Sequence, residues 1–227
     1  MAIGLVIAGI ICVLAPAPTG PSGPEGGLLA HEHETGHAEH PPDVFAQSLF
    51  HLFHPVHMFF SAAATTAMFW RYERRLLKAV VIGIVGAVGI CGISDIIMPY
   101  ASQFLLVKLG ALEPRQPLHL HICIIQHPGL VLPFAVIGVA VGLGAALAVE
   151  RSTLFSHSLH VLSSTMASIF YLISPFGRTD WIDGVGFVFL LVVLAVMIPC
   201  CASDIVFPLA LARPERERHA QGHHAHH

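Results

Sequence analysis

The sequence predicts an all-α integral membrane protein with five to six transmembrane helices. Hydrophobic residues make up 55% of the 227 residues and charged residues only 11%, whereas soluble proteins carry about 25% charged residues. The mean hydropathy is +0.72. Apolar stretches near the length of about 20 residues that spans a bilayer recur along the chain. We therefore expect a lipid bilayer, that of a bacterial inner membrane, as the environment of the protein.

Five apolar stretches predict membrane helices, and a sixth stretch is ambiguous. The five are residues 45–70, 79–98, 118–149, 153–174 and 184–211. The sixth, residues 1–16, is short, has no Lys or Arg, and is followed by the A-x-A pattern that signal peptidase reads. It is therefore either a first membrane helix or a cleaved signal peptide.

The helices and two polar tracts divide the chain into five regions. Residues 1–16 are the ambiguous segment and residues 17–43 form a His-rich loop. Residues 44–117 hold the helices of a first half with a loop, residues 118–211 hold the helices of a second half, and residues 212–227 form a His-rich tail. Histidine-rich tracts of this kind are typical of metal binding.

Basic residues predict the orientation of the chain in the membrane. They gather after the first strong span, in the turn before residue 153, and in the tail: Arg71, Arg74, Arg75, Lys78, Arg151, Arg213, Arg216 and Arg218. Cytoplasmic loops carry an excess of Lys and Arg. We therefore expect these segments and the C-terminus in the cytoplasm, with residues 17–43 outside.

Two short patterns occur twice in the same order. Residues 54–61 (HPVHMFFS) and 157–164 (HSLHVLSS) share HxxHxxxS, and residues 92–100 (GISDIIMPY) and 201–209 (CASDIVFPL) share a Ser-Asp pair and a following proline. The predicted orientation makes the two HxxH helices run in opposite directions. The pattern therefore predicts two three-helix halves of inverted topology, an arrangement found in many transporters.

The repeat predicts an outer metal site. His54 and His57 share one helical face, because residues three apart are neighbours on a helix. Counting about 1.5 Å per residue from the cytoplasmic boundary puts His54 and Asp95 level, about 25 Å above the inner surface. His127, near the outer end of a later span, is a further candidate ligand.

The second copy of the repeat predicts an inner site made of His157, His160 and Asp204. The same count puts His160 and Asp204 about 13 Å from the cytoplasmic side, well below the outer site. The sequence thus predicts two sites at two depths, each with two imidazoles and one carboxylate.

These ligand types suit a divalent transition metal such as zinc, nickel, cobalt or iron, and the lack of a thiolate cluster argues against copper(I). The five cysteines read as buried thiols without a CxxC pair. Ionisable side chains inside a membrane cost about 2.5 kcal/mol or more and usually serve a function. The favoured function is therefore transition-metal transport or homeostasis.

Two other functions remain open at this stage. The histidines are candidate axial ligands of haem in an electron-transfer protein, with His54 or His57 facing His127. Alternatively, Asp95 and Asp204 hold the histidines in a structural polar network without metal. The net charge of −3 gives no basic surface for nucleic acid.

An enzyme is the less favoured class, because no HExxH motif is present. Transport energy must come from a gradient or a partner, because no GxxxxGK[ST] motif is present either. Both a homo-oligomer and a partner subunit are compatible with the sequence. In its His-rich tails and membrane histidines the chain is loosely similar to bacterial nickel and cobalt permeases, but none of their signature motifs is intact.

Overall fold

The computed structural model describes residues 44–148, 152–176, 179–202 and 206–212. Every regular element in these ranges is a helix, and the described residues contain no strand. The expectations for residues 1–43 and 213–227, which include the ambiguous first segment and both His-rich tracts, lie outside the described residues. The predicted all-α fold is confirmed for the described part of the chain.

The helices follow one another with short connections, apart from residues 109–122. In chain order they are α2 (Val44–Tyr72), α3 (Leu76–Val85), the π-turns η1 (Gly86–Ile90) and η2 (Ile93–Ile97), α4 (Met98–Lys108), α5 (Cys123–Gln126), α6 (Pro128–Ala148), α7 (Ser152–Ile173), the 3-10 turn η3 (Asp180–Ile182), α8 (Val185–Cys201) and α9 (Phe207–Leu211).

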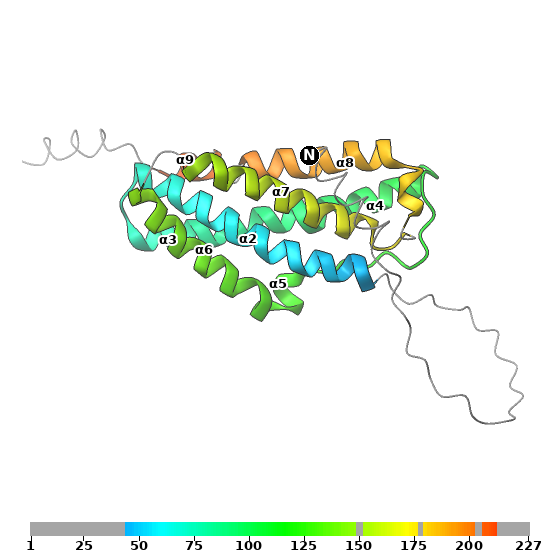
Figure 1. Cartoon of the computed structure of the whole chain (residues 1–227), viewed down its shortest axis with the longest axis horizontal. Coiled ribbons are helices and arrows are strands. Elements are labelled where there is room, and N and C mark those ends of the chain that lie inside the picture. The colour runs from blue at the N-terminus through cyan, green and yellow to red at the C-terminus, as the bar shows by residue number, and fades with distance from the viewer. Residues whose placement is uncertain (1–43, 149–151, 177–178, 203–205, 213–227) are drawn as a thin grey trace, which may run out of the picture.

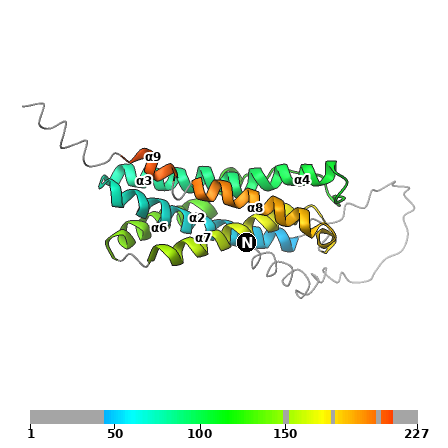
Figure 2. The same cartoon turned by 90° about the horizontal axis from the view of Figure 1, so that it is seen from above.

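The long helices lie side by side along one axis, as Figures 1 and 2 show from two directions. Helix α2 is central and packs against α3, α6 and α7. The rings of Phe50 and Tyr171 meet near one end of α2, and His57 meets His160 further along it, so α2 and α7 are antiparallel. This direction agrees with the predicted opposite orientation of the two HxxH helices.

Helices α2 and α6 run parallel and pack closely through glycine. A β-carbon at Gly138 would collide with the backbone oxygen of Phe59, and one at Gly142 would collide with that of Ala63. Small residues let helix backbones approach closely in membrane proteins. The two glycines therefore fix the distance between the backbones of α2 and α6.

The helix from α3 to α4 widens in the middle, where η1 and η2 interrupt its regular turns. Pro99 follows η2, and because proline has no N–H it cannot bond to the Ser94 carbonyl five residues earlier in the π pattern. The hydroxyl of Ser168 on α7 donates to that carbonyl instead, at 3.1 Å. Such π-turns often occur at functional sites. Here η1 and η2 flank Cys91, and η2 contains Asp95.

Two helical stretches are long and apolar enough to cross a membrane, Leu76–Lys108 and Pro128–Ala145. Ser158–Ile173 and Val185–Cys200 are also apolar but are shorter. All five predicted stretches contain helix, but the described residues do not confirm five to six membrane spans. That count stays a prediction.

Candidate metal centre

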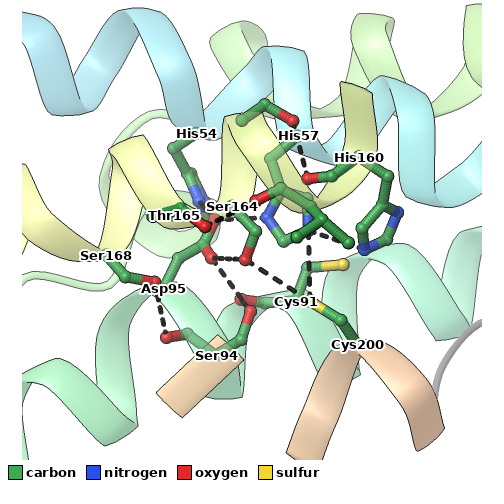
Figure 3. Close-up of polar contacts among 12 residues, drawn as sticks. His54, His57, Cys91, Ser94, Asp95, His160, Ser164, Thr165, Ser168 and Cys200 are labelled. Carbon is green, nitrogen blue, oxygen red and sulfur yellow. Dashed lines mark hydrogen bonds and ion pairs between the residues drawn. The ribbon is translucent and has the colours of Figure 1, made fainter. Parts of the chain in front are cut away.

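A group of polar side chains lies buried where α2, η2, α7 and α8 meet (Figure 3). The side chains of His54, His57, Asp95 and His160 are at most 1% exposed. Burying polar groups of this kind is costly unless they are hydrogen-bonded or bind a ligand. We therefore expect each of their nitrogen and oxygen atoms to have a hydrogen-bond partner or to bind a ligand.

Asp95 holds two of the histidines through one of its oxygens. Its Oδ2 accepts hydrogen bonds from Nδ1 of His54 at 2.8 Å and from Nδ1 of His57 at 2.6 Å. Its Oδ1 accepts from the hydroxyls of Ser94 at 2.9 Å and Ser164 at 3.2 Å. Since both oxygens are engaged, Asp95 is placed to orient imidazoles rather than to face an ion.

Orientation by Asp95 decides which nitrogen of His57 is available. A carboxylate that accepts from Nδ1 fixes the tautomer of a neutral imidazole and leaves the Nε2 lone pair for another partner. That Nε2 lies 3.1 Å from Nε2 of His160. Metal-binding histidines usually have such a carboxylate or carbonyl behind them.

Two cysteines complete this side of the cluster. One ligand atom each from His57, Cys91 and His160 lie within 4.8 Å of one another. The sulfur of Cys200 lies 4.0 Å from Nε2 of His57 and donates to the Ser164 hydroxyl at 3.4 Å. Both thiols are free and buried, and Figure 3 shows their sulfurs beside the His57 imidazole. We call His57, His160, Cys91 and Cys200 the central site.

Two of these distances, 3.1 Å between the two Nε2 atoms and 4.0 Å from the Cys200 sulfur to Nε2 of His57, are near those between ligands of a tetrahedral ion. Metal–nitrogen bonds of about 2.0 Å and metal–sulfur bonds of about 2.3 Å place tetrahedral ligand atoms about 3.3 to 3.8 Å apart. Two nitrogens and two sulfurs in this geometry are typical of zinc. Thiolates also favour copper(I). The sequence-based argument against copper(I) assumed that no thiols lie together, and the structure places two cysteines beside His57.

The structure changes the predicted pair of sites. His54, His57 and Asp95 lie together as expected, but His160, expected at a separate inner depth, lies against His57. Helix α2 continues well past His57 to Tyr72, whereas α7 starts only two turns before His160. The ends of the two helices are therefore not level, and counting from those ends misplaced His160.

The other predicted ligands do not lie in the central site or are not described. His157 belongs to α7, but its side chain is not among those described, and Asp204 lies outside the described residues. His127 lies near His51 and His121, with ring centroids 5.2 Å and 5.5 Å away. It therefore belongs to a group with His51 and His121 at the end of the bundle.

A second group of possible ligands lies where α2 begins and the connection 109–122 leads into α5. Nε2 of His51 lies 3.1 Å from Nε2 of His121, and one ligand atom each from His51, His121 and Cys123 lie within 4.8 Å of one another. Burial and, secondly, the nearby His127 lower the pKa of His121. The lowered pKa favours the neutral form of this imidazole, which lies outside the helices and whose neutral form is the one that binds metal.

Cys91 and Cys200 were missed as ligands, although the sequence holds a signal for them. Each stands four residues before the aspartate of the repeated Ser-Asp pair, Cys91 before Asp95 and Cys200 before Asp204. The repeat therefore extends to a cysteine four residues before each aspartate.

Comparisons with known proteins give no relative for this chain. No protein-family model, no curated protein and no solved structure matches it.

Proposed function

We propose that the protein is a membrane protein that binds a transition-metal ion at the central site and serves the transport or homeostasis of that metal. Zinc fits the two imidazoles and two thiols best, and copper(I) is the next choice. Nickel, cobalt and iron, which suit imidazole and carboxylate ligands, fit this mixture of nitrogen and sulfur less well.

The observation that carries this proposal is a buried group in which one ligand atom each of His57, Cys91 and His160 lie within 4.8 Å of one another, with the Cys200 sulfur 4.0 Å from Nε2 of His57. His57 and His160 come from α2 and α7, and Cys91 and Cys200 come from the α3–α4 helix and α8. Structural packing alone does not require two thiols and two imidazole nitrogens to meet. Asp95 adds the carboxylate that orients a metal-binding histidine.

The distribution of polarity supports a membrane location. Large apolar side chains are exposed along the α3–α4 helix, α6 and α8, among them Val85, Phe104, Ile137, Leu190 and Ile198. The polar cluster, by contrast, is buried inside the bundle. An apolar surface around a polar interior is what a lipid environment favours, because ionisable groups in membrane helices face the protein interior.

The internal repeat supports a site shared between two inverted halves. His57 and His160 occupy equivalent positions of HxxHxxxS, and Cys91 and Cys200 occupy equivalent positions before Ser-Asp. Each half thus supplies one histidine and one cysteine. Inverted-repeat transporters commonly bind their substrate at the interface between the halves, which favours transport over storage.

The geometry favours a single ion over haem. Two axial ligands at about 2 Å from iron stand about 4 Å apart on opposite faces of a flat porphyrin. Nε2 of His57 and Nε2 of His160 are 3.1 Å apart and in direct contact. A porphyrin does not fit between them, whereas one ion does.

Elemental analysis of the full chain tests the binding site. The purified protein is reloaded with zinc under reducing conditions, and a weak chelator then removes ions held by the His-rich tracts. We expect His160→Ala and Cys200→Ser to retain one zinc fewer per chain than the wild type. His119→Ala, which removes an exposed histidine that belongs to neither group of candidate ligands, is the matched control and should retain the wild-type amount.

Equal zinc content in all four proteins would contradict a central metal site. Thermal unfolding of each variant checks that a loss of zinc is not a loss of fold. Transport is tested separately with proteoliposomes that contain a zinc-sensitive dye: the wild type should admit zinc, and His160→Ala should not. If the wild type binds zinc but zinc does not enter the proteoliposomes, the result contradicts transport and supports metal homeostasis through binding alone.

A further inference from the structure

The second cluster of possible ligands lies at the end of the bundle where α2 begins. It contains His51 on α2, His121 at the end of the connection 109–122, Cys123 at the start of α5 and His127 just after α5. Nε2 of His51 and Nε2 of His121 are 3.1 Å apart. The ring of His127 lies 5.2 Å from that of His51, centroid to centroid.

The backbone holds these side chains in place. The N–H of His121 donates to the hydroxyl of Tyr171 at 2.9 Å, and the Tyr171 ring packs edge-on against Phe50. The N–H of His127 donates to the Cys123 carbonyl at 2.7 Å, which closes the turn of α5. A short, internally bonded turn therefore carries three of the four side chains toward His51.

Accessibility separates this cluster from the central site. His51 and His121 are partly exposed and His127 is exposed in the described part of the chain, whereas Cys123 is fully buried. The members of the central site are buried. An ion can therefore reach the second cluster without opening the bundle.

The two clusters lie at different heights along α2 and share no residue. His51, His54 and His57 are spaced by three, so His51 stands about 9 Å from His57 along the helix axis. His54 lies between them, and its Nε2 is buried without a hydrogen-bond partner among the described residues. The separation is too large for one ion to be bound by both clusters.

We propose that His51, His121, His127 and Cys123 form a second transition-metal site, accessible from solvent at the end of the bundle. Three imidazoles and one thiol suit zinc, cobalt or nickel. With only one soft sulfur, this site favours divalent ions over copper(I) more strongly than the central site does. Its partial exposure makes it the site at which an ion first meets the folded bundle.

Cobalt(II) titration of the full-length protein tests this site directly. Cobalt with four tetrahedral ligands absorbs visible light far more strongly than six-coordinate cobalt, which disordered histidine tracts hold. We expect the wild type to reach the absorbance of two tetrahedral sites. The double variant His51→Ala, His121→Ala should lose about half of it, and His119→Ala should lose none.

Single substitutions identify the ligands of each site. Cys123→Ser should reduce the near-ultraviolet charge-transfer band from sulfur to cobalt. The part of this band that comes from Cys91 and Cys200 should persist. His127→Ala removes an exposed side chain, and it should weaken cobalt binding at the second site while binding at the central site is unchanged. Thermal unfolding in detergent confirms that each variant is folded.

The outcomes separate this proposal from the central site. Wild-type absorbance in the double variant would overturn the second site and leave the central site untouched. If His160→Ala loses about half of the wild-type cobalt absorbance and the double variant loses the other half, the result supports both sites. If His160→Ala shows wild-type absorbance while the double variant loses all of it, the central site fails and the second site alone stands.

Discussion

Nε2 of His57 lies 3.1 Å from Nε2 of His160, although the two residues are 103 positions apart in the chain. His57 donates from Nδ1 to Asp95 at 2.6 Å, so in the neutral ring Nε2 is an acceptor and His160 supplies the proton between them. A metal ion at this point takes both Nε2 lone pairs, so the proton of a neutral His160 shifts to its Nδ1 and stays on the ring. The protons that metal binding is expected to release therefore come from the Cys91 and Cys200 thiols, which would bind as thiolates.

The role of Asp95 predicts the effect of Asp95→Asn. An asparagine has one oxygen and one NH2 group, so it cannot accept from both histidines and both serine hydroxyls at once. Loss of such an orienting partner typically weakens metal binding 10- to 100-fold. We expect zinc to bind the variant that much more weakly, as measured by competition with a chelator of known affinity.

The comparison with His160→Ala makes this prediction specific. A variant that lacks a ligand should lose the ion from the central site, whereas Asp95→Asn should still load at high zinc. If Asp95→Asn loses the ion as completely as His160→Ala does, Asp95 is itself a ligand, as the sequence first suggested. If its affinity is unchanged, the carboxylate has only a structural role.

The close packing of α2 on α6 predicts that alanine is poorly tolerated at two glycines. In Gly138→Ala and Gly142→Ala the new methyl group meets the backbone oxygens of Phe59 and Ala63, which cannot rotate away. Overpacking of this kind costs about 1 to 3 kcal/mol. We expect both variants to unfold at a lower temperature than the wild type in the same detergent.

Gly144 provides the matched control on the same helix. A β-carbon there meets nothing within 4 Å, and alanine is favoured over glycine in a helix by about 0.5 to 1 kcal/mol. Gly144→Ala should therefore unfold at the wild-type temperature or slightly above it. Equal stability of all three variants would mean that α2 and α6 are not in close contact.

The distribution of basic residues predicts which end of the bundle faces the cytoplasm. Arg74 lies in the connection between α2 and α3, and His119 lies at the opposite end, in the connection before α5; both are exposed. In intact cells, a membrane-impermeant thiol reagent should label His119→Cys and Gly27→Cys. It should label Arg74→Cys only after the membrane is permeabilised.

The parent protein with its natural cysteines gives the background of this labelling experiment. Labelling of Arg74→Cys in intact cells with protection of His119→Cys would reverse the orientation. Equal labelling of both positions in intact cells, as for a chain that does not cross the membrane, would contradict the membrane topology altogether.

The sequence by itself determined the helical class and the positions of the long helices. Apolar stretches of membrane length cannot satisfy their backbone groups in lipid except as helices, and α2 and α7 begin and end within two residues of the predicted stretches. Helix α6 begins ten residues after the start of the predicted stretch 118–149. It also identified His54, His57 and Asp95 as partners, because helical spacing and a short connection bring neighbouring antiparallel helices into register.

Only the tertiary structure decided how the two halves meet. The depth of His160 depends on where α7 starts relative to α2, and no pattern within either helix records that offset. The approach of Cys91 and Cys200 to His57 depends on π-turns and on packing between distant helices. Helical periodicity is a local property, whereas the convergence of four ligands is fixed by contacts between segments up to 143 residues apart.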